Sequence, residues 1–210
     1  ALRLVGSEMC IRDSYYYMRD FYASTGESPV VLRYVDWTLT VPLMCVEFYL
    51  ITKKAGGTKS ILWKLIGASV VMLVCGYIGE AFYADMSSSW VWGALSGAAY
   101  FYIVWMVFRG DVAKLANSAG GQVAKANKML GKFVLIGWAI YPIGYILGTT
   151  GGLFGMDLGI NANTEVLNLC YNIADAVNKI GFGLVIYSLA ISDNKATASV
   201  SYTHLRAHET

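Results

Sequence analysis

Charge is scarce in this chain of 210 residues. Lys, Arg, Asp and Glu make up 14% of it, whereas 56% of the residues are hydrophobic and the mean hydropathy is +0.49. Because soluble domains carry roughly 25% charged residues, this composition excludes an ordinary soluble protein. The net charge of +2 is too small to favour nucleic acid as a partner. We interpret the chain as a polytopic membrane protein that contacts the lipid bilayer.

Histidine and cysteine are also scarce, which bears on metal and disulfide chemistry. The only two histidines, His204 and His208, lie near the C-terminus. The four cysteines are far apart in the sequence, at Cys10, Cys45, Cys75 and Cys170. This spacing fits no disulfide framework and no metal-binding motif, so we predict no metal site.

The two ends of the chain differ in composition from its body. Residues 1–14 carry charges without a continuous apolar core, so they do not read as a signal peptide. They and residues 200–210 resemble translated adapter sequence, and we expect both to be non-native. We therefore divide the chain into a tail (1–14), a membrane domain (15–195) and a C-terminal tail (196–210).

Long apolar runs dominate the body of the chain. A membrane-spanning helix needs about 20 predominantly apolar residues. Five segments qualify, approximately Val30 to Thr52, Ile61 to Ala84, Trp90 to Phe108, Leu130 to Gly148, and Val166 to Ile191. Pro42 and Pro142 fall inside two of them and should kink those helices. The sequence thus predicts an all-α bundle of five membrane helices, preceded by the end of another helix and a loop.

Positive charges occur in alternate connections between these spans. They lie at Lys53, Lys54, Lys59, Arg109, Lys114, Lys125, Lys128 and Lys195. The connections at 84–89 and 149–165 contain no Lys or Arg. By the positive-inside rule, the lysine-bearing connections face the cytoplasm. We therefore expect a multi-pass protein of the inner membrane with a cytoplasmic C-terminus.

The first span carries polar side chains in series. The eleven steps from Asp36 to Glu47 make about three helical turns, so both carboxylates share one face, roughly 16 Å apart along the axis. Thr40 and Arg33 each lie about one turn from Asp36, on opposite sides of it. Intramembrane carboxylates in series are typical of a proton relay. Two separate ion pairs that pack helices together are the alternative.

The fifth span contains a lysine in the middle of an apolar run. Lys179 and Asp175 are four residues apart and share one helix face with Tyr171. A charge near the bilayer centre costs roughly 3 kcal/mol or more, so an intramembrane lysine indicates function. A desolvated lysine can form a Schiff base with a carbonyl compound. A structural Asp/Lys pair is the alternative.

The fourth span contributes the aromatic residues Trp138 and Tyr141, followed by Pro142. Their spacing could line one side of a pocket, although aromatic residues at such spacing more often pack in a core or face lipid.

These motifs together resemble the microbial rhodopsins. The resemblance rests on RYVDWTLTVPL followed by Glu47, on WAIYP, and on the DxxxK pattern of ADAVNK. EFYLI, GYIGE and GWAIYPIGY are similar to the proteorhodopsin branch. The resemblance implies a seven-helix fold, all-trans retinal bound to a lysine as a protonated Schiff base, and light-driven outward proton pumping. It implies a transporter of protons rather than an enzyme, and we expect the full-length form to be a homo-oligomer.

The resemblance also implies roles for individual residues. Lys179 would bind retinal, Asp36 would accept the proton, and Glu47 would donate one from the cytoplasmic side. Asp175 would be the second counterion, and Arg33 would adjust that cluster. The residues around the chromophore would be Trp37, Thr40, Met44, Trp138, Tyr141, Pro142 and Tyr171. Met44 falls on the spectral-tuning position, where an apolar residue implies green absorption.

The chain departs from the family pattern at its N-terminus. The family has seven spans, and we expect that its first helix and most of its second lie outside this chain. The histidine that bonds the acceptor aspartate would fall at Ser14.

A photosensory rhodopsin that signals to a transducer is the alternative function, although Glu47 argues against it. A retinal-free solute transporter would leave Lys179 unmodified.

Overall fold

The computed structural model describes residues 16–152, 154–155 and 164–207. Its elements are α2 (Val30–Lys53), α3 (Lys59–Phe82), α4 (Ser89–Phe108), α5 (Asp111–Ala119), α6 (Gly121–Lys132), the π-helix η1 (Phe133–Gly137), α7 (Ile140–Gly148) and α8 (Thr164–Ala207). Residues 16–25 are also helical, at the place where the sequence predicts the end of a preceding helix. The described residues contain no strand, and the predicted all-α class is confirmed.

Five segments of the described chain are long and apolar enough to cross a membrane. They are Val30–Lys53, Lys59–Phe82, Ser89–Ala119, Gly121–Gly148 and Glu165–Ser192. Each contains one of the five predicted spans or most of it, so the sequence found the right number in the right places. The protein is a multi-pass membrane protein.

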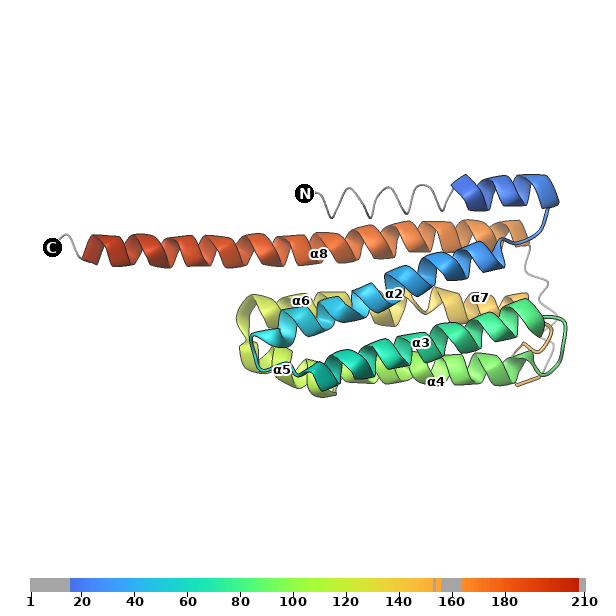
Figure 1. The fold of residues 1–210 in the computed structure, drawn as a ribbon, viewed down its shortest axis with the longest axis horizontal. Coiled ribbons are helices and arrows are strands. Elements are labelled where there is room, and N and C mark those ends of the chain that lie inside the picture. Colours follow the sequence, from blue (N-terminus) through green and yellow to red (C-terminus); the bar gives the residue numbers. More distant parts are fainter. Residues whose placement is uncertain (1–15, 153, 156–163, 208–210) are drawn as a thin grey trace.

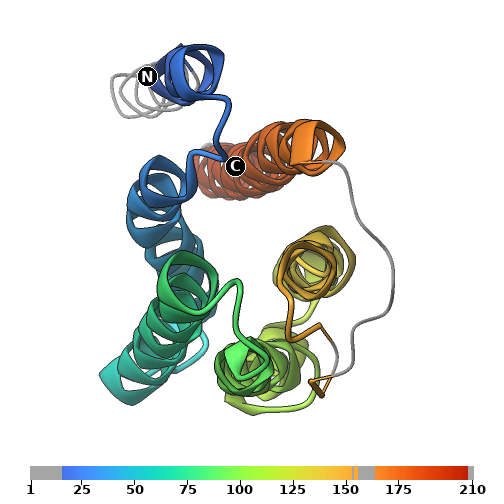
Figure 2. The same ribbon diagram turned by 90° about the vertical axis from the view of Figure 1, so that its right-hand side faces the viewer.

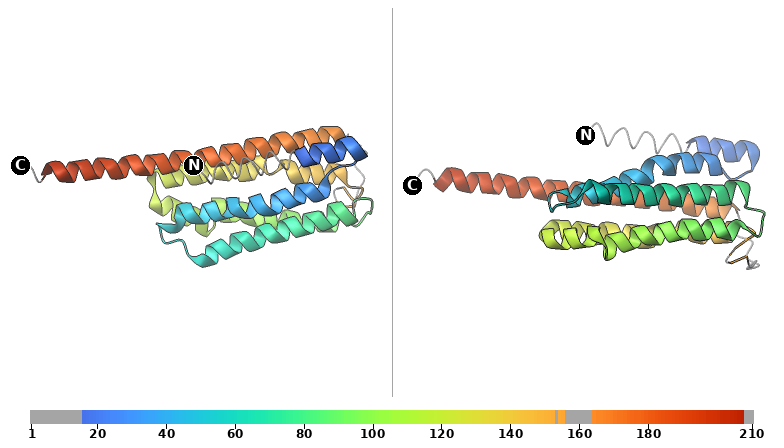
Figure 3. Two further views of the ribbon diagram at one scale, coloured as in Figure 1. Left: turned by 45° about the horizontal axis from the view of Figure 1, so that its top comes forward. Right: turned by 60° about the horizontal axis from the view of Figure 1, so that its bottom comes forward.

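The helices run side by side along the long axis of the molecule (Figure 1). Seen along their axes, α2, α3, α4, α7 and α8 follow one another around a ring that closes where α8 returns to α2 (Figure 2). We call one end of the bundle the Glu80 end; α2 and α8 begin there and α3 finishes there. The opposite end is the α5–α6 end, and α8 continues well past it (Figure 3).

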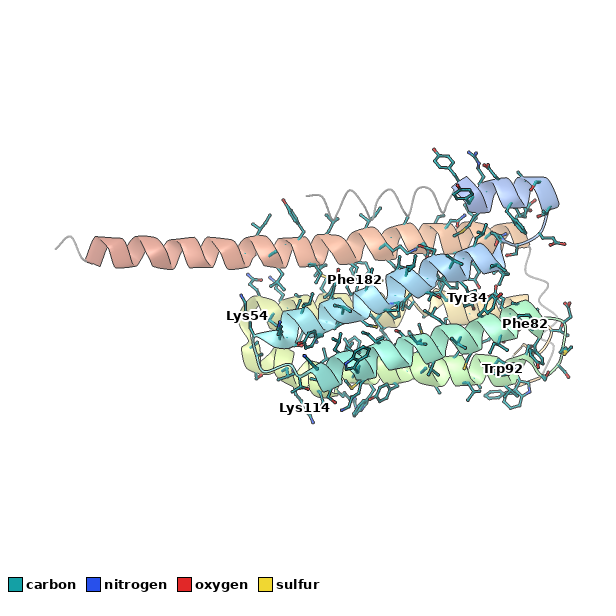
Figure 4. The ribbon with its side chains drawn as sticks, viewed as in Figure 1. Tyr34, Lys54, Phe82, Trp92, Lys114 and Phe182 are labelled. Atoms are coloured by element: carbon teal, nitrogen blue, oxygen red, sulfur yellow. The ribbon has the colours of Figure 1, made fainter. Side chains whose placement is uncertain are left out.

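The connection predicted between the third and fourth spans is a pair of helices. The short helices α5 and α6 continue α4 and precede η1, and they contact α2 and α8. Their buried residues recur at helical spacing, as at Val112, Ala113 and Ala116 on α5. Such amphipathic helices have a low average hydropathy, so a search for apolar runs misses them. Lys54 and Lys114 lie at this end of the bundle, whereas Phe82 and Trp92 lie at the Glu80 end (Figure 4).

The predicted kink at Pro142 takes the form of a π-helical turn. Trp138 N–H donates to the carbonyl oxygen of Phe133, five residues earlier, at 3.0 Å. Pro142 has no N–H to offer Trp138, whose carbonyl oxygen instead accepts from Tyr141 N–H at 3.1 Å. The fourth span is therefore divided into α6, η1 and α7. Pro42 lies within α2, which continues through it to Lys53.

Some sequence-based predictions lie outside the described residues. These concern the tail at 1–14, the position of Ser14 and the last three residues. The predicted boundary between 195 and 196 falls within α8, whose backbone is helical on both sides of it.

Candidate functional site

The side chain of Lys179 contacts two carboxylates near the middle of the bundle. Its Nζ donates to Oδ2 of Asp36 on α2 and, at 3.3 Å, to Oδ2 of Asp175 one turn earlier on α8. The side chains of Lys179, Asp36 and Asp175 are only 9%, 8% and 15% exposed. Buried charges persist only when they are paired, and here one cation faces two anions. The structure thus brings together three of the five charged residues that the sequence singled out.

Asp175 is held by two further donors from neighbouring helices. Trp37 Nε1 on α2 lies 3.1 Å from both of its carboxylate oxygens, and Tyr141 Oη on α7 lies 2.5 Å from Oδ1. With Lys179, three donors surround this carboxylate. Hydrogen bonds from several donors stabilise the ionised form of a carboxylate.

Aromatic rings pack around the same carboxylate. The ring centroid of Trp37 lies 4.8 Å from that of Tyr141 and 5.9 Å from that of Tyr171, both in edge-to-face arrangements. Tyr141 and Tyr171 stack at 5.8 Å. These rings exclude water from one side of the Lys179 cluster and hold α2, α7 and α8 together.

A cavity of about 470 Å³ adjoins Lys179 and runs between α2, α3, α4 and α7. All eight residues that the sequence proposed around a cofactor line it: Trp37, Thr40, Met44, Trp138, Tyr141, Pro142, Tyr171 and Lys179. Most of its wall is apolar, and the acidic and basic residues in it are Glu80, Asp175 and Lys179. Pockets of this kind bind largely apolar ligands that a few polar groups orient.

The part of the wall that comes from α3 and α4 was not predicted from the sequence. Met72 and Leu73 of α3, and Gly93, Gly97 and Phe101 of α4, also line the cavity. The four-residue spacing of Gly93 and Gly97 places both on one helix face, and this pattern could have indicated a close approach to the site.

Arg33 bonds to a different carboxylate from the two beside Lys179. Its guanidinium donates to Glu80 Oε1 at 3.2 Å, to Asn168 Oδ1 at 2.5 Å and to Ser28 Oγ at 3.2 Å. It also lies over the ring of Tyr171, 4.5 Å from the centroid. Arg33 was expected to adjust the counterion cluster from one turn of α2 further out, and it lies there, on the Glu80 side of Asp36. Glu80, for which the sequence suggested no role, is its carboxylate partner.

Glu47 is not part of the Lys179 cluster. Its Oε2 atom is buried and has no hydrogen-bond partner among the described residues. The buried side chains of Met44, Trp138, Phe48 and Phe182 belong to an apolar core in the same half of the bundle, with the rings of Phe48 and Phe182 5.6 Å apart. Phe182, one turn beyond Lys179 on α8, points into the bundle (Figure 4). An apolar layer thus separates Glu47 from Lys179.

Comparison with known proteins agrees with this geometry. Residues 8–193 match the family described as bacteriorhodopsin-like protein. The chain belongs to this family. It is a microbial rhodopsin of the proteorhodopsin type, as the sequence motifs predicted.

The matched relatives resemble the rhodopsin over most of its length. The green-light absorbing proteorhodopsin of Gamma-proteobacterium EBAC31A08 is 42% identical over 181 residues, which are 86% of this chain and 69% of the relative. The blue-light absorbing proteorhodopsin of Gamma-proteobacterium Hot 75m4 is 39% identical, with coverage of 86% and 68%. The crystal structure of Exiguobacterium sibiricum rhodopsin superposes with a TM-score of 0.67 at 34% identity and covers 84% of this chain and 74% of that one.

Proposed function

We propose that this light-driven proton pump-type rhodopsin moves protons outward, and that all-trans retinal is bound to Lys179 as a protonated Schiff base. The observation that carries the proposal is the contact of Lys179 Nζ with Asp36 and Asp175 at the wall of a largely apolar cavity. The proteorhodopsin type of the chain supports it.

The cavity fits an elongated apolar aldehyde such as retinal. Lys179 offers the only amine among the residues that line it, and Met44, Trp138 and Tyr141 offer apolar and aromatic surface along its length. When bound, retinal supplies the chromophore whose isomerisation by light reduces the hold of the Lys179 nitrogen on its proton. The two carboxylates beside that nitrogen offset the positive charge that it carries in the dark.

Asp36 is better suited than Asp175 to take that proton. Asp175 accepts hydrogen bonds from Trp37, Tyr141 and Lys179, and these bonds persist when the lysine nitrogen loses its charge. For Asp36, Lys179 is the side-chain hydrogen-bond partner that the structure gives. Once that partner is neutral, the Asp36 carboxylate is left buried without a cation, and protonation relieves the cost.

Glu47 is placed to return a proton to the lysine nitrogen from the other side. It shares α2 with Asp36 but lies eleven residues further toward the α5–α6 end. The apolar layer around Phe182 separates it from Lys179 in the resting state and prevents the proton from flowing straight through. A donor and an acceptor on opposite sides of one nitrogen give the transport its direction.

The distribution of charge supports an orientation. We place the α5–α6 end, with Lys54 and Lys114, in the cytoplasm and the Glu80 end outside. The C-terminus is then cytoplasmic and the membrane is the inner membrane. We also propose that the protein forms a homo-oligomer within the lipid bilayer.

Light-dependent acidification tests this function directly. The protein, expressed from its complete reading frame in a bacterial host with retinal, should acidify the medium on illumination and show a visible absorption band. Lys179→Ala should abolish the band, because the amine is gone. Asp36→Asn should retain the band and lose acidification. Persistent acidification by the Asp36→Asn variant would contradict the acceptor role. A pigment that never acidifies the medium would favour the photosensory alternative.

A further inference from the structure

One buried hydroxyl group joins α4 to the irregular turn of the fourth span. Tyr100 of α4 is 5% exposed, and its Oη donates to the carbonyl oxygens of Val134 at 3.1 Å and Leu135 at 2.8 Å in η1. In an α-helix the Val134 carbonyl would accept from Trp138 N–H, which here donates to Phe133 instead. The hydroxyl of Tyr100 thus offers the Val134 carbonyl oxygen a donor from outside its own helix.

The turn η1 contacts both the cavity and the apolar layer beside Glu47. Val134 is fully buried in the apolar core that separates Glu47 from Lys179. Trp138 follows η1 directly, and its side chain belongs to that core and also lines the cavity. A displacement of η1 would therefore change the cavity wall and the apolar layer together.

The two sides of η1 differ in how closely they are packed. On the side of α8, Gly137 has no room for a side chain, because the amide of Asn178 lies against it. On the outer surface, Ile136 is 69% exposed. A displacement of η1 is therefore free only in the outward direction, and the hydrogen bond from Tyr100 opposes it.

The fourth span is the wall of the apolar core that can yield with the least loss of helical hydrogen bonds. Helices α2, α4 and α8 are continuous where they pass this core, whereas the fourth span is divided into α6, η1 and α7. Helices bend at π-helical turns, which are rare and often occur at functional sites. A proton from Glu47 can reach Lys179 only when the apolar layer opens, so η1 is the element that we expect to move.

We propose that Tyr100 is a positioning residue for the proton transfer from Glu47, because its hydroxyl holds η1 in place and thereby sets the rate at which the apolar layer opens. This proposal rests on the proposed function, in which Glu47 is the donor. No covalent bond changes at Tyr100. The hydrogen bond from its Oη to the carbonyl oxygens of η1 breaks when Trp138 is pushed outward from the cavity, and it forms again when the layer closes.

Flash kinetics of Tyr100→Phe test the proposal, with Tyr102→Phe as the matched control. Phenylalanine keeps the ring in the core and removes only the hydroxyl. Reprotonation of the Lys179 nitrogen should be roughly fivefold faster in Tyr100→Phe, because one hydrogen bond that opposes opening is lost, while its deprotonation keeps the unchanged rate. Tyr102 is 38% exposed on the same helix and stacks on Trp105, so its variant should show neither effect.

Several kinetic results would overturn the proposal. These are a reprotonation rate in Tyr100→Phe that is unchanged or lower, an equal change in both steps, and the same acceleration in Tyr102→Phe.

Infrared spectroscopy of the hydroxyl gives a readout that a purely structural role would not produce. In protein whose tyrosines carry ¹³C at the carbon bonded to the hydroxyl, a labelled C–O band should shift after the Lys179 nitrogen has lost its proton and return as it regains one. The shift should persist in Tyr102→Phe and be lost in Tyr100→Phe. A shift of unaltered size in Tyr100→Phe would contradict the proposal. Absence of any such shift from the unchanged protein would also overturn it and needs no variant that folds. Failure of the unchanged protein to acidify the medium would instead reject the proposed function itself.

Discussion

Glu47 differs from Asp175 and Glu80 because one of its oxygens is buried without a donor. Oε2 is buried without a hydrogen-bond partner among the described residues, whereas Asp175 and Glu80 each accept bonds at both oxygens. A buried polar atom without a partner normally costs about 1–3 kcal/mol. That cost falls when the carboxyl group carries a proton, which is the state that a proton donor must hold at rest.

Glu47→Gln should slow recovery of the resting absorption spectrum by roughly 100-fold, because the variant side chain has no proton to give. Flash photolysis measures this recovery. Asp111→Asn, an exposed carboxylate at the α5–α6 end that pairs with Lys64, is the control and should recover normally. A diffusible weak acid should speed recovery in the Glu47→Gln variant. Unchanged recovery without any added acid would remove Glu47 as the donor.

Some site residues could be predicted from their spacing along one helix. Others could not, because their roles depend on contacts between helices. Asp36, Asp175 and Lys179 were found because each is a charge in an apolar run, and helical periodicity placed them on faces that could meet. The partnership of Arg33 with Glu80 could not be found in this way. It joins two helices whose relative rotation is set by many side-chain contacts. The spacing of residues along one helix does not predict how that helix is rotated against its neighbour.

Among the helices, the fourth span shows how the bundle accommodates a proline beside the cavity. The π-helix η1 precedes Pro142, and Tyr100 of α4 donates its hydroxyl to the carbonyl oxygens of Val134 and Leu135 at 3.1 Å and 2.8 Å. Such π-helical turns are rare and often occur at functional sites. Tyr100 thus ties the irregular turn to a regular neighbouring helix.

Tyr100→Phe should lower the stability of the bundle by about 1 kcal/mol, because the hydrogen bond that the buried hydroxyl shares between two carbonyl oxygens is lost. The expected fall in melting temperature is roughly 2–4 °C, measured by circular dichroism. Tyr102→Phe is the control, since Tyr102 is 38% exposed on the same helix. An equal change in both variants would mean that the hydroxyl of Tyr100 does not hold the turn.

The existence of the spans was predictable from hydropathy, but the interruption of the fourth was only partly so. Pro142 predicted a kink, but the form of the kink depends on the hydroxyl of Tyr100, which donates to backbone carbonyl oxygens of the turn from another helix. The helices α5 and α6 were missed because their apolar residues occupy one face only.

For the molecule as a whole, the two ends of the bundle differ in their charged residues. The α5–α6 end carries most of the lysines of the described chain, including Lys54 and Lys114, and the Glu80 end carries the buried Arg33 cluster. Exposed apolar side chains cover the outer surface of the helices between these ends, as lipid contact requires. The charge asymmetry therefore bears on orientation, and with it on the direction in which protons move.

Cysteine labelling in intact spheroplasts should show this orientation. A membrane-impermeant maleimide should modify Ser88→Cys, at the Glu80 end, and should modify Asn117→Cys, at the α5–α6 end, only after lysis. Both positions are exposed. The unsubstituted protein gives the background from its own cysteines. The reverse labelling pattern would mean that the protein has the opposite orientation in the membrane, and the same proton steps would then carry protons inward.

Helix α2 supplies Arg33, Asp36, Trp37, Thr40, Met44 and Glu47. The proposed acceptor and donor therefore sit on one continuous helix, and their separation is set by the number of residues between them rather than by how the bundle packs. Inserting one residue between Asp36 and Glu47 would lengthen that separation by only about 1.5 Å but would turn Glu47 by about 100°, away from the helix face that it shares with Asp36. Proton pumping in this protein should thus tolerate many substitutions along α2, but it should not tolerate an insertion or deletion between Asp36 and Glu47.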